Sequence, residues 1–330
     1  MSTILVEARK DANVRPALDL IAKTCRGLGH DVFRWRGPLS GRVPYWRHPF
    51  DCDLAILFNG THVKYCPALA RLKQIGAKLL FVELGWYPQK GTVQIDRAGI
   101  NARASWAGEP LTVDGTRPLK VRTAGDLLVL MQLDSDTQIT ELSPWFANMR
   151  GFVTHVCRHS ALPVRVRAHP LAPPAAELVR EVEQLGATWD HSASLADALA
   201  GCKAVACINS SSGIDALARR LPVLCYGLAI YRHLGAVYCL TGCEQETRLA
   251  TEQLATGNCP LFEERSDAAA MRALDHQWSF HEISQRLPPM IEAQLPSPAT
   301  RAARKFGIVP TLLRFVRDLP EHLLARRQAA

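Results

Sequence analysis

Short apolar runs alternate with segments of helical periodicity along the chain. The apolar runs place Val, Ile and Leu at consecutive positions, which is typical of strands buried on both faces of a parallel sheet. Such runs occupy residues 3–8, 54–59, 78–83, 127–133, 164–168, 187–190, 204–208 and 222–226. Helical patterns lie between them, over residues 14–28, 67–75, 175–185, 195–200 and 213–220. This repeated βα order predicts doubly wound α/β layers.

The alternation pauses over residues 84–125, a stretch rich in Gly, Pro, Trp and polar residues. Loops of this length inside compact domains are usually functional. A helix is expected to start after Ser143-Pro144, because proline favours the first helical position. We therefore place a domain boundary near residue 145 and predict two Rossmann-like domains that face a central cleft. The expected units are residues 1–145, 146–300 and a set of basic C-terminal helices over 301–330.

Composition agrees with this picture. The chain has 330 residues, of which 48% are hydrophobic and 21% charged, so it is globular rather than disordered. Single cores stop growing at roughly 250–300 residues, which favours two domains. Charged residues between positions 7 and 11 occupy the place where a signal peptide needs its apolar region. The 10 cysteines form no CxxC motif and are read as reduced thiols, so we expect a cytoplasmic protein.

The net charge of +8 is concentrated near the C-terminus. Basic residues outnumber the two acidic residues, Asp318 and Glu321, over positions 301–330. A basic segment suits an anionic partner such as lipid headgroups or a phosphorylated substrate. Its apolar and cationic positions predict either helices that pack across the two domains or a peripheral contact with the inner membrane. No nucleic-acid recognition module accompanies the charge, so a nucleic-acid partner is not expected.

The sharpest local signal is a strand that runs into a serine cluster at the start of a helix. Strand 204–208 is followed by Asn209, Ser210, Ser211 and Ser212. Ser212 and Asp215 have the spacing of a capping box, which predicts a helix that begins at Gly213. Backbone N–H groups and hydroxyls at a helix N-terminus suit a phosphate group. The alternative is that these serines only cap the helix.

A second strand of the same half ends in a histidine. Strand 164–168 is followed by His169 and Pro170. Ligands of α/β sheets gather at the carboxyl ends of the strands, so His169 is expected at the same edge as the serines. An imidazole there can donate a hydrogen bond to phosphate or transfer a proton near neutral pH. The alternative is a structural histidine.

The N-terminal half offers carboxylates at equivalent positions. Glu83 ends strand 78–83, and Asp134 and Asp136 follow strand 127–133. A carboxylate that faces a cleft from a strand end can act as a nucleophile or a general base. Each can instead cap a helix or pair with an arginine. Asp96 lies in the long loop, where it binds substrate or forms a turn.

Other motif classes are missing from the sequence. No HExxH motif or zinc spacing is present, so a metal site is not expected. The first strand is not followed by GxGxxG, and neither a P-loop nor a GxSxG elbow occurs. Asn59-Gly-Thr61 matches a glycosylation sequon, which a cytoplasmic chain does not use.

Several segments, in order from about residue 80 to 235, resemble the bacterial capsule and lipopolysaccharide β-Kdo transferases. Kdo is the eight-carbon acidic sugar 3-deoxy-manno-octulosonic acid. The segments that carry the resemblance are ELGWYPQ (83–89), DRAGIN (96–101), LMQLDSDTQI (130–139), RAHP (167–170), NSSSGIDAL (209–217) and LPVLCYGLAIY (221–231).

The resemblance implies a GT-B fold, a CMP-Kdo donor and no cofactor or metal. The N-terminal domain would carry the acceptor side and the catalytic carboxylates, and the C-terminal domain would bind the donor. It assigns the CMP moiety to His169, Pro170, Asn209, Ser210, Ser211 and Ser212, with Gly227 and Tyr231 lining the pocket. Members of this family retain the anomeric configuration, which implies double displacement through an aspartate.

Within that assignment Asp136 is the expected nucleophile and Asp134 the fallback, with Glu83 as acid or base for the acceptor hydroxyl. His169 is the third residue expected to take part in catalysis. The expected acceptor or sugar contacts are Gln132, Asp96, Asn101 and Asp134. The Kdo carboxylate needs a cation, for which the candidates are Arg103, Arg158, Arg167 and Arg232.

The expected function is transfer of Kdo to a glycan or lipid-linked oligosaccharide during the synthesis of lipopolysaccharide O-antigen or capsule. Two alternatives stay open. The donor could be another CMP-sugar, such as a sialic or related nonulosonic acid, or a UDP-sugar. The chain could instead be a catalytically silent glycan-binding module of the same fold.

Overall fold

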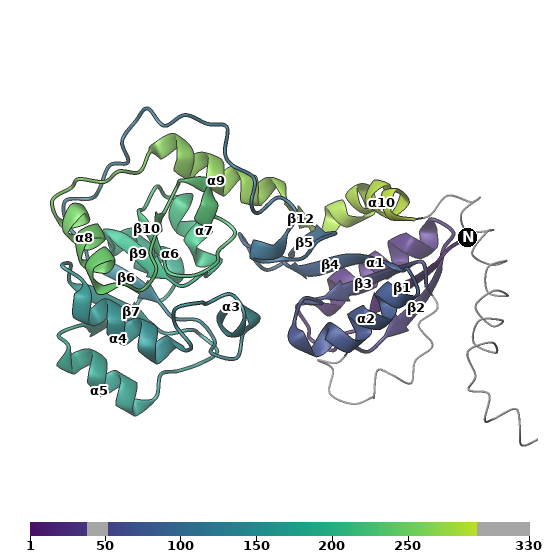
Figure 1. Ribbon diagram of the computed structural model, residues 1–330, viewed down its shortest axis with the longest axis horizontal. Coiled ribbons are helices and arrows are strands. Elements are labelled where there is room, and N and C mark those ends of the chain that lie inside the picture. Colours follow the sequence, from purple (N-terminus) through teal and green to yellow (C-terminus); the bar gives the residue numbers. More distant parts are fainter. Residues whose placement is uncertain (38–51, 296–330) are drawn as a thin grey trace, which may run out of the picture.

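The computed structural model describes residues 1–37 and 52–295. These residues form two α/β domains, each built on a six-stranded sheet, joined side by side along the long axis of the molecule (Figure 1). The first sheet has the strand order β12-β5-β4-β3-β1-β2 and the second the order β11-β10-β9-β6-β7-β8. The prediction of two Rossmann-like α/β domains is confirmed.

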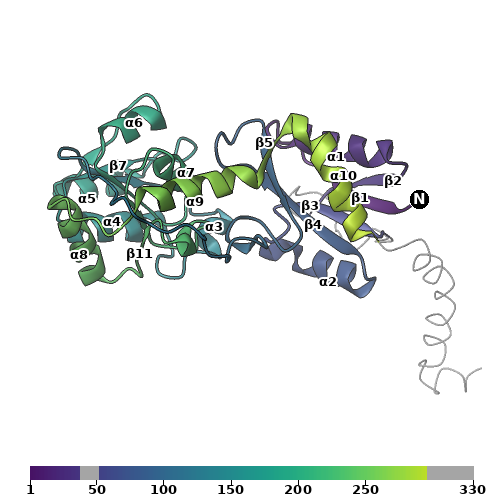
Figure 2. The same ribbon diagram turned by 90° about the horizontal axis from the view of Figure 1, so that it is seen from above.

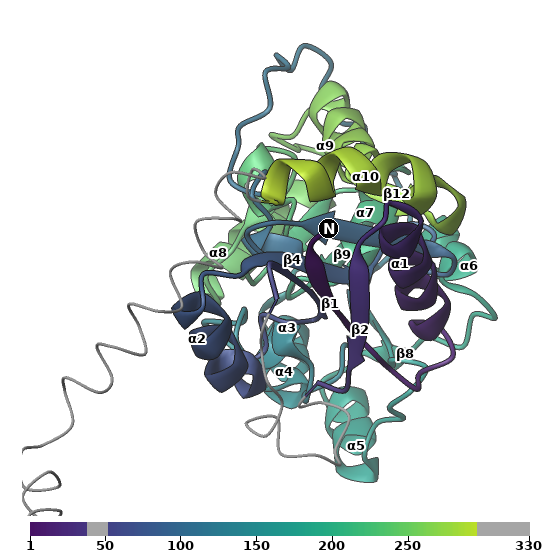
Figure 3. The same cartoon turned by 90° about the vertical axis from the view of Figure 1, so that its right-hand side faces the viewer.

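The first domain begins with four parallel strands. Its N-terminal elements are β1 (Thr3–Glu7), α1 (Arg15–Gly27), β2 (Asp31–Trp35), β3 (Leu54–Phe58), η3 (Val63–Tyr65), α2 (Cys66–Gln74), β4 (Lys78–Leu84), β5 (Thr92–Asp96) and η4 (Asn101–Arg103). β5 runs antiparallel to β4. Ile4 and Val6 pack toward α1 on one face of the sheet, and Leu5 packs toward α2 on the other. Figure 3 shows these two helices on opposite sides of β1.

The second domain is a parallel sheet with helices on both faces. Its elements are β6 (Leu127–Leu130), α3 (Thr137–Thr140), α4 (Met149–His159), β7 (Val164–Arg167), α5 (Ala176–Gln184), β8 (Thr188–Trp189), α6 (Leu195–Gly201), β9 (Ala204–Cys207), α7 (Ser212–Leu217), β10 (Val223–Cys225), η5 (Arg232–Leu234), β11 (Tyr238–Cys239), α8 (Glu244–Ala255) and α9 (Glu263–Asp275). The strands β6, β9 and β10 are buried throughout, which explains their continuous apolar sequences.

The chain crosses between the domains twice. Residues 97–126 lead into the second domain, and α9 leads back to the first (Figure 2). The returning chain forms β12 (Gln277–Ser279), η6 (Phe280–Glu282) and α10 (Ile283–Gln294). β12 pairs antiparallel with β5, and α10 packs against α1. The two crossings meet where Trp106 stacks on His276, with ring centroids 4.1 Å apart.

The point at which the chain leaves the first sheet for the second therefore differs from the predicted boundary near residue 145. β6 pairs with β7 and β9 of the second sheet, so the second domain begins before Leu127. Residues 277–294 belong with the first domain and not with the expected unit 146–300. A buried apolar strand looks the same in either sheet, and its sequence does not reveal which neighbours it will have.

Several individual helices and strands also differ from the predicted ones. The helix expected after Pro144 begins at Met149, because the Asn148 side chain accepts the Gly151 N–H at 2.9 Å and caps it there. The short strands β2, β5, β11 and β12 were not predicted. The helices expected over 301–330 lie outside the described residues. Within the ranges 1–37 and 52–295, no helix is long and apolar enough to cross a membrane.

Candidate active site

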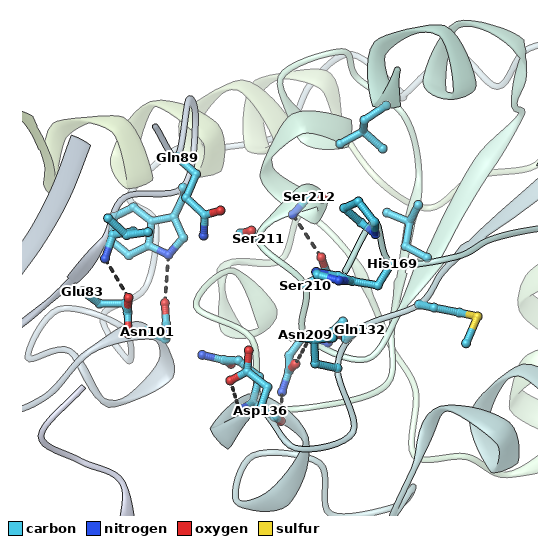
Figure 4. A pocket seen from close by; sticks show the side chains of 18 of the residues that line it. Glu83, Gln89, Asn101, Gln132, Asp136, His169, Asn209, Ser210, Ser211 and Ser212 are labelled. Carbon is cyan, nitrogen blue, oxygen red and sulfur yellow. Dashed lines mark hydrogen bonds between the residues drawn. The ribbon is translucent and has the colours of Figure 1, made fainter. Parts of the chain in front are cut away.

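A cleft of about 580 Å³ lies between the two domains and is lined by both. Figure 4 shows Glu83 on the side of the first domain, with Asp136, His169 and the serine cluster opposite. Most of these residues follow the carboxyl ends of strands, where ligands of α/β sheets bind. The predicted site residues that line the cleft are Glu83, Asn101, Gln132, Asp136, His169, Pro170, Asn209, Ser210, Ser211, Ser212 and Tyr231.

Glu83 lies near the end of β4 with its carboxylate in the cleft. Its Oε1 accepts the N–H of Leu84 at 2.8 Å. Burial raises the pKa of Glu83 to about 8, and the negative charge of Asp136 adds to the rise. A carboxyl group with this pKa exchanges protons near neutral pH, as a general acid or base must.

Asp136 enters the cleft as the N-cap of α3. Its Oδ1 accepts the N–H of Gln138 and the hydroxyl of Thr137, both at 3.1 Å. Among the described residues, Oδ2 has no hydrogen-bond donor. Asp136 therefore caps a helix and faces the cleft at the same time, although the sequence offered these two roles as alternatives. One oxygen fixes the side chain and the other is available to a ligand.

Gln132 and Asn209 hold the Asp136 segment in place. The Gln132 amide donates to Asn209 Oδ1 at 2.9 Å, and Gln132 Oε1 accepts the Asn209 N–H at 3.2 Å. Asn209 Nδ2 donates to the carbonyls of Gln138, at 2.7 Å, and Leu142, at 3.1 Å. The polar atoms of Asn209 are thus occupied by the protein itself. This residue, expected among the donor contacts, positions the loop between β6 and α4.

His169 follows β7 and lies half-buried in the cleft lining of the second domain. Its Nδ1 accepts the N–H of Leu171 at 3.2 Å, so in the neutral ring the proton is on Nε2. Burial lowers the pKa of His169, although the charge of Asp136 opposes this effect. Burial therefore favours the neutral ring, whose Nε2–H is available for a ligand.

The serine cluster leads from β9 into α7. Ser210 Oγ accepts the N–H of Ser212 at 3.2 Å, while the Ser210 carbonyl accepts the hydroxyl of Tyr231 at 2.7 Å. No hydrogen bond to the hydroxyls of Ser211 and Ser212 occurs within residues 1–37 and 52–295. Tyr231 itself is buried, so it supports the loop from below.

The capping box predicted here is not formed. α7 starts at Ser212, one residue earlier than expected, and its N-cap Ser211 makes no side-chain capping bond. The Asp215 side chain pairs instead with Arg219 at 3.8 Å. Because the hydroxyls of Ser211 and Ser212 do not cap the helix, they remain free for a ligand.

Three expected site residues do not line the cleft. Asp96 is buried, and its carboxylate accepts the N–H groups of Ala98, Gly99 and Ser105, so it forms the turn after β5. Asp134 is exposed and accepts the Met149 N–H at 2.6 Å. Gly227 is buried against Ile208, where an added Cβ would lie 2.5 Å from the Ile208 side chain. All three make contacts within the protein outside the cleft lining, and the ligand contacts expected of them stay predictions.

The structure separates the four arginine candidates for the Kdo carboxylate. Arg167 lines the cleft and pairs with Asp190. Arg103 and Arg158 pair with acidic residues outside the cleft lining, and Arg232 is buried with its guanidinium on backbone carbonyls. Of the four, Arg167 is therefore the one placed to meet a ligand.

Sequence reasoning missed several polar residues of the first domain, among them Asn59 in the cleft and Glu7, which does not line it. Asn59 lines the cleft at the end of β3, in a left-handed conformation with φ 48°. Glu7 ends β1, is fully buried, and accepts the Tyr65 hydroxyl at 2.7 Å and the Phe58 N–H at 3.0 Å. Burial raises the pKa of Glu7 to about 7. The strand-end rule, applied to β1 and β3 as it was to β4, would have found both.

Metal ligands do not cluster in the part of the chain that the structure describes: no group of three His, Cys, Asp or Glu side chains there could hold an ion.

With this geometry in place, comparisons with known proteins give the family. Residues 97–255 match the capsule polysaccharide biosynthesis proteins. The match covers just under half of the chain. The matched segment contains Asp136, His169 and the serine cluster, and it overlaps most of the region in which the sequence resemblance was recognised. The resemblance to capsule biosynthesis proteins is confirmed.

Protein FixF of Sinorhizobium fredii is 31% identical to this chain over the aligned part, which covers 32% of the chain and 30% of FixF. The chain thus matches less than a third of the length of this curated relative.

Among solved structures, KpsC of Thermosulfurimonas dismutans, described as a β-Kdo 2,7 transferase, superposes with a TM-score of 0.51. The identity is 15%, and the alignment covers 88% of this chain and 99% of that chain. MurG of Acinetobacter baumannii gives a TM-score of 0.39 at 10% identity, over 86% of this chain and 98% of that one. At 15% identity the likeness to KpsC concerns the fold, which is the GT-B fold of glycosyltransferases. The predicted fold class is confirmed.

Proposed function

We propose that the chain is a retaining glycosyltransferase that moves Kdo from CMP-Kdo to a glycan or glycolipid hydroxyl in cell-surface polysaccharide synthesis. One observation carries the proposal. A single cleft between two GT-B domains holds one carboxylate from each domain and, on the same side as Asp136, a histidine and free serine hydroxyls. The two carboxylates suit a double displacement at the anomeric carbon of the sugar. The histidine and the serine hydroxyls suit the phosphate of the leaving group.

The CMP end of the donor belongs on the second domain. His169 Nε2–H and the hydroxyls of Ser211 and Ser212 are hydrogen-bond donors without protein acceptors among the described residues, and all three side chains line the cleft. As the bond to the anomeric carbon breaks, negative charge develops on the phosphate oxygen. Donors fixed around that oxygen stabilise the transition state more than the ground state, each by about 2–4 kcal/mol.

Asp136 is the proposed nucleophile. Its Oδ2 attacks the anomeric carbon, the bond from that carbon to the phosphate oxygen breaks, and the bonding electrons leave with CMP. The hydrogen bonds from Gln138 and Thr137 to Oδ1 hold the carboxylate in one orientation, so little reorganisation is needed for attack. A second displacement by the acceptor hydroxyl releases Asp136 and restores the configuration of the donor.

Glu83 is the proposed base of that second displacement. It faces Asp136 from the other domain. With its pKa raised to about 8, the ionised form is a stronger base than an ordinary carboxylate. It takes the proton of the acceptor hydroxyl as the oxygen bonds to the anomeric carbon. Arg167 is the proposed partner of the Kdo carboxylate, because it lines the cleft beside His169.

A donor panel tests this proposal. The purified chain is incubated with CMP-Kdo generated from Kdo and CTP, with CMP-sialic acid, and with UDP-sugars, each with a mixture of Kdo-terminated and lipopolysaccharide-derived acceptors. Release of CMP and formation of a β-linked product, detected by NMR, are expected with CMP-Kdo alone. Transfer from CMP-sialic acid or a UDP-sugar would retain the glycosyltransferase and exclude Kdo as donor. A lack of turnover with every donor would favour a glycan-binding module.

A further inference from the structure

We propose that Glu141 is a positioning residue that ties the Asp136 segment to the opposite domain and thereby sets the distance between the two catalytic carboxylates. The inference rests on the proposed function for its catalytic part. Its structural part stands on contacts that neither the sequence nor the comparisons assign. Glu141 directly follows α3, the short helix whose N-cap is Asp136.

The Glu141 carboxylate is bound by two donors of the first domain. Oε1 accepts the N–H of Val63 at 3.1 Å, and Oε2 lies 2.7 Å from a guanidinium nitrogen of Arg103. The same nitrogen of Arg103 donates to the carbonyl of Thr61 at 3.0 Å, which fixes the guanidinium on the segment that follows β3. We name this group of contacts, from Glu141 to Val63 and Arg103, the Glu141 bridge.

The bridge has the features of a specific contact. One of its contacts is the ion pair between Glu141 and Arg103, with 2.7 Å between the carboxylate oxygen and the guanidinium nitrogen. The Glu141 side chain is only 17% exposed, so water competes for it less than for an open surface pair. Since the second donor is a backbone N–H, the bridge also fixes the position of Glu141 relative to the main chain of the first domain.

α3 is held from the other side by its own domain. Asn209 binds the carbonyls of Gln138 and Leu142, and the Leu228 N–H donates to the Leu142 carbonyl at 2.9 Å. The segment that carries Asp136 is therefore attached to both domains at once. If the Glu141 bridge breaks, the attachment to the second domain remains. Asp136 then keeps its place beside the donor site but loses its fixed relation to Glu83.

This arrangement separates donor binding from transfer. His169 and the serine cluster lie on the second domain and make no contact with the bridge, so loss of the bridge should leave CMP affinity unchanged. The turnover number depends on both carboxylates and should fall. Misplacement of a reacting group by about 1 Å can lower the rate roughly 100-fold, so we expect a 10- to 100-fold decrease in kcat.

The test combines kinetics with hydrogen–deuterium exchange of the full chain. Glu141→Ala removes the bridge, and Arg103→Met removes its ion pair while keeping the length of the side chain. We expect faster exchange at residues 137–142 and 63–65 in both variants, a lower kcat with CMP-Kdo, and an unchanged Kd for CMP by calorimetry. The double variant should be no slower than Glu141→Ala alone, because both changes remove one interaction.

Glu264→Gln is the matched control. The Glu264 carboxylate also binds a backbone N–H and a guanidinium, those of Arg117, but it does so away from the cleft. Its loss should change neither exchange at residues 137–142 nor kcat.

Unchanged exchange in Glu141→Ala, or faster exchange with the wild-type kcat, would overturn the positioning role. If the wild-type chain does not transfer Kdo at all, the proposed function fails. Exchange at residues 137–142 then decides by itself whether the bridge holds α3.

Discussion

Asp136 and Glu83 face each other across the cleft from different domains, and the charge of Asp136 contributes to the raised pKa of Glu83. The two carboxylates are therefore electrostatically coupled while belonging to separate folding units. One is held by a helix cap and the other by burial at a strand end. In the proposed mechanism Asp136 is the nucleophile, and Glu83, whose pKa is raised to about 8, transfers the proton.

Replacement of the nucleophile should abolish transfer without loss of donor binding. Asp136→Asn preserves the acceptor oxygen that caps α3, so the fold is kept, but the amide does not attack the anomeric carbon. We expect the rate of transfer to fall roughly 1000-fold or more, with the Kd for CMP unchanged. Asp134→Asn is the matched control, because Asp134 lies outside the cleft lining and an amide oxygen still accepts the Met149 N–H. Equal rates for the two variants would contradict the assignment of Asp136.

Removal of the His169 ring should weaken CMP binding. A hydrogen bond to a charged phosphate contributes about 1.5–3 kcal/mol, so His169→Ala should raise the Kd for CMP by at least about tenfold in calorimetry. His281→Ala, which changes an exposed histidine on η6 outside the cleft lining, should leave the affinity unchanged. An unaltered Kd in His169→Ala would remove this residue from the nucleotide site.

The rate of transfer should rise with pH up to about 8. Glu83 acts as a base only when it is ionised, and burial raises its pKa to about 8. Below that pH the ionised fraction, and with it the rate at saturating donor, should increase about tenfold for each pH unit. Glu83→Gln should lower the rate and remove this dependence. A wild-type rate that stays constant or falls between pH 6 and 8 would assign the proton transfer to another group.

The stability of the protein should decrease as the pH rises from 5 to 8. Glu7 has a folded-state pKa of about 7, above its value of 4.5 in the unfolded chain, so the fold favours the neutral form. Its contribution is complete below pH 4.5 and is lost as the pH rises through 7. The shift corresponds to roughly 3 kcal/mol, and Glu83 acts in the same direction.

Glu7→Gln tests this dependence, because its amide oxygen still accepts the Phe58 N–H and its NH2 can donate to the Tyr65 oxygen, whose hydroxyl is also within reach of the Phe58 carbonyl. The melting temperature of the variant should depend less on pH between 5 and 8 than that of the wild type, by several degrees in thermal scans. Identical pH profiles of the two proteins would show that Glu7 does not titrate in this range.

The sequence predicted the long buried strands and the helices between them, because a strand covered on both faces must be apolar at every position. It did not predict β2 or β5, whose sequences DVFRW and TVQID mix polar and apolar residues. The strand-end rule likewise identified Glu83, His169 and the serines. It could not show that Asn209 is saturated by Gln132, or that Gly227 packs on Ile208, because those contacts depend on side-chain geometry between distant segments.

The return of the chain through α9 to β12 affects the order in which the domains can fold during synthesis and the choice of fragments that contain a whole domain. The first domain receives β12 and α10 only after the whole second domain has been synthesised. Residues 127–262 can therefore close their sheet on the ribosome before the N-terminal sheet has its last strand. A fragment that ends at residue 145 lacks both β12 and α10. It also contains β6 without β7 and β9, the strands with which β6 pairs. Expression of single domains should instead join residues 1–96 to 277–295 by a short linker, leaving residues 127–275, which include α9, as the separate second unit.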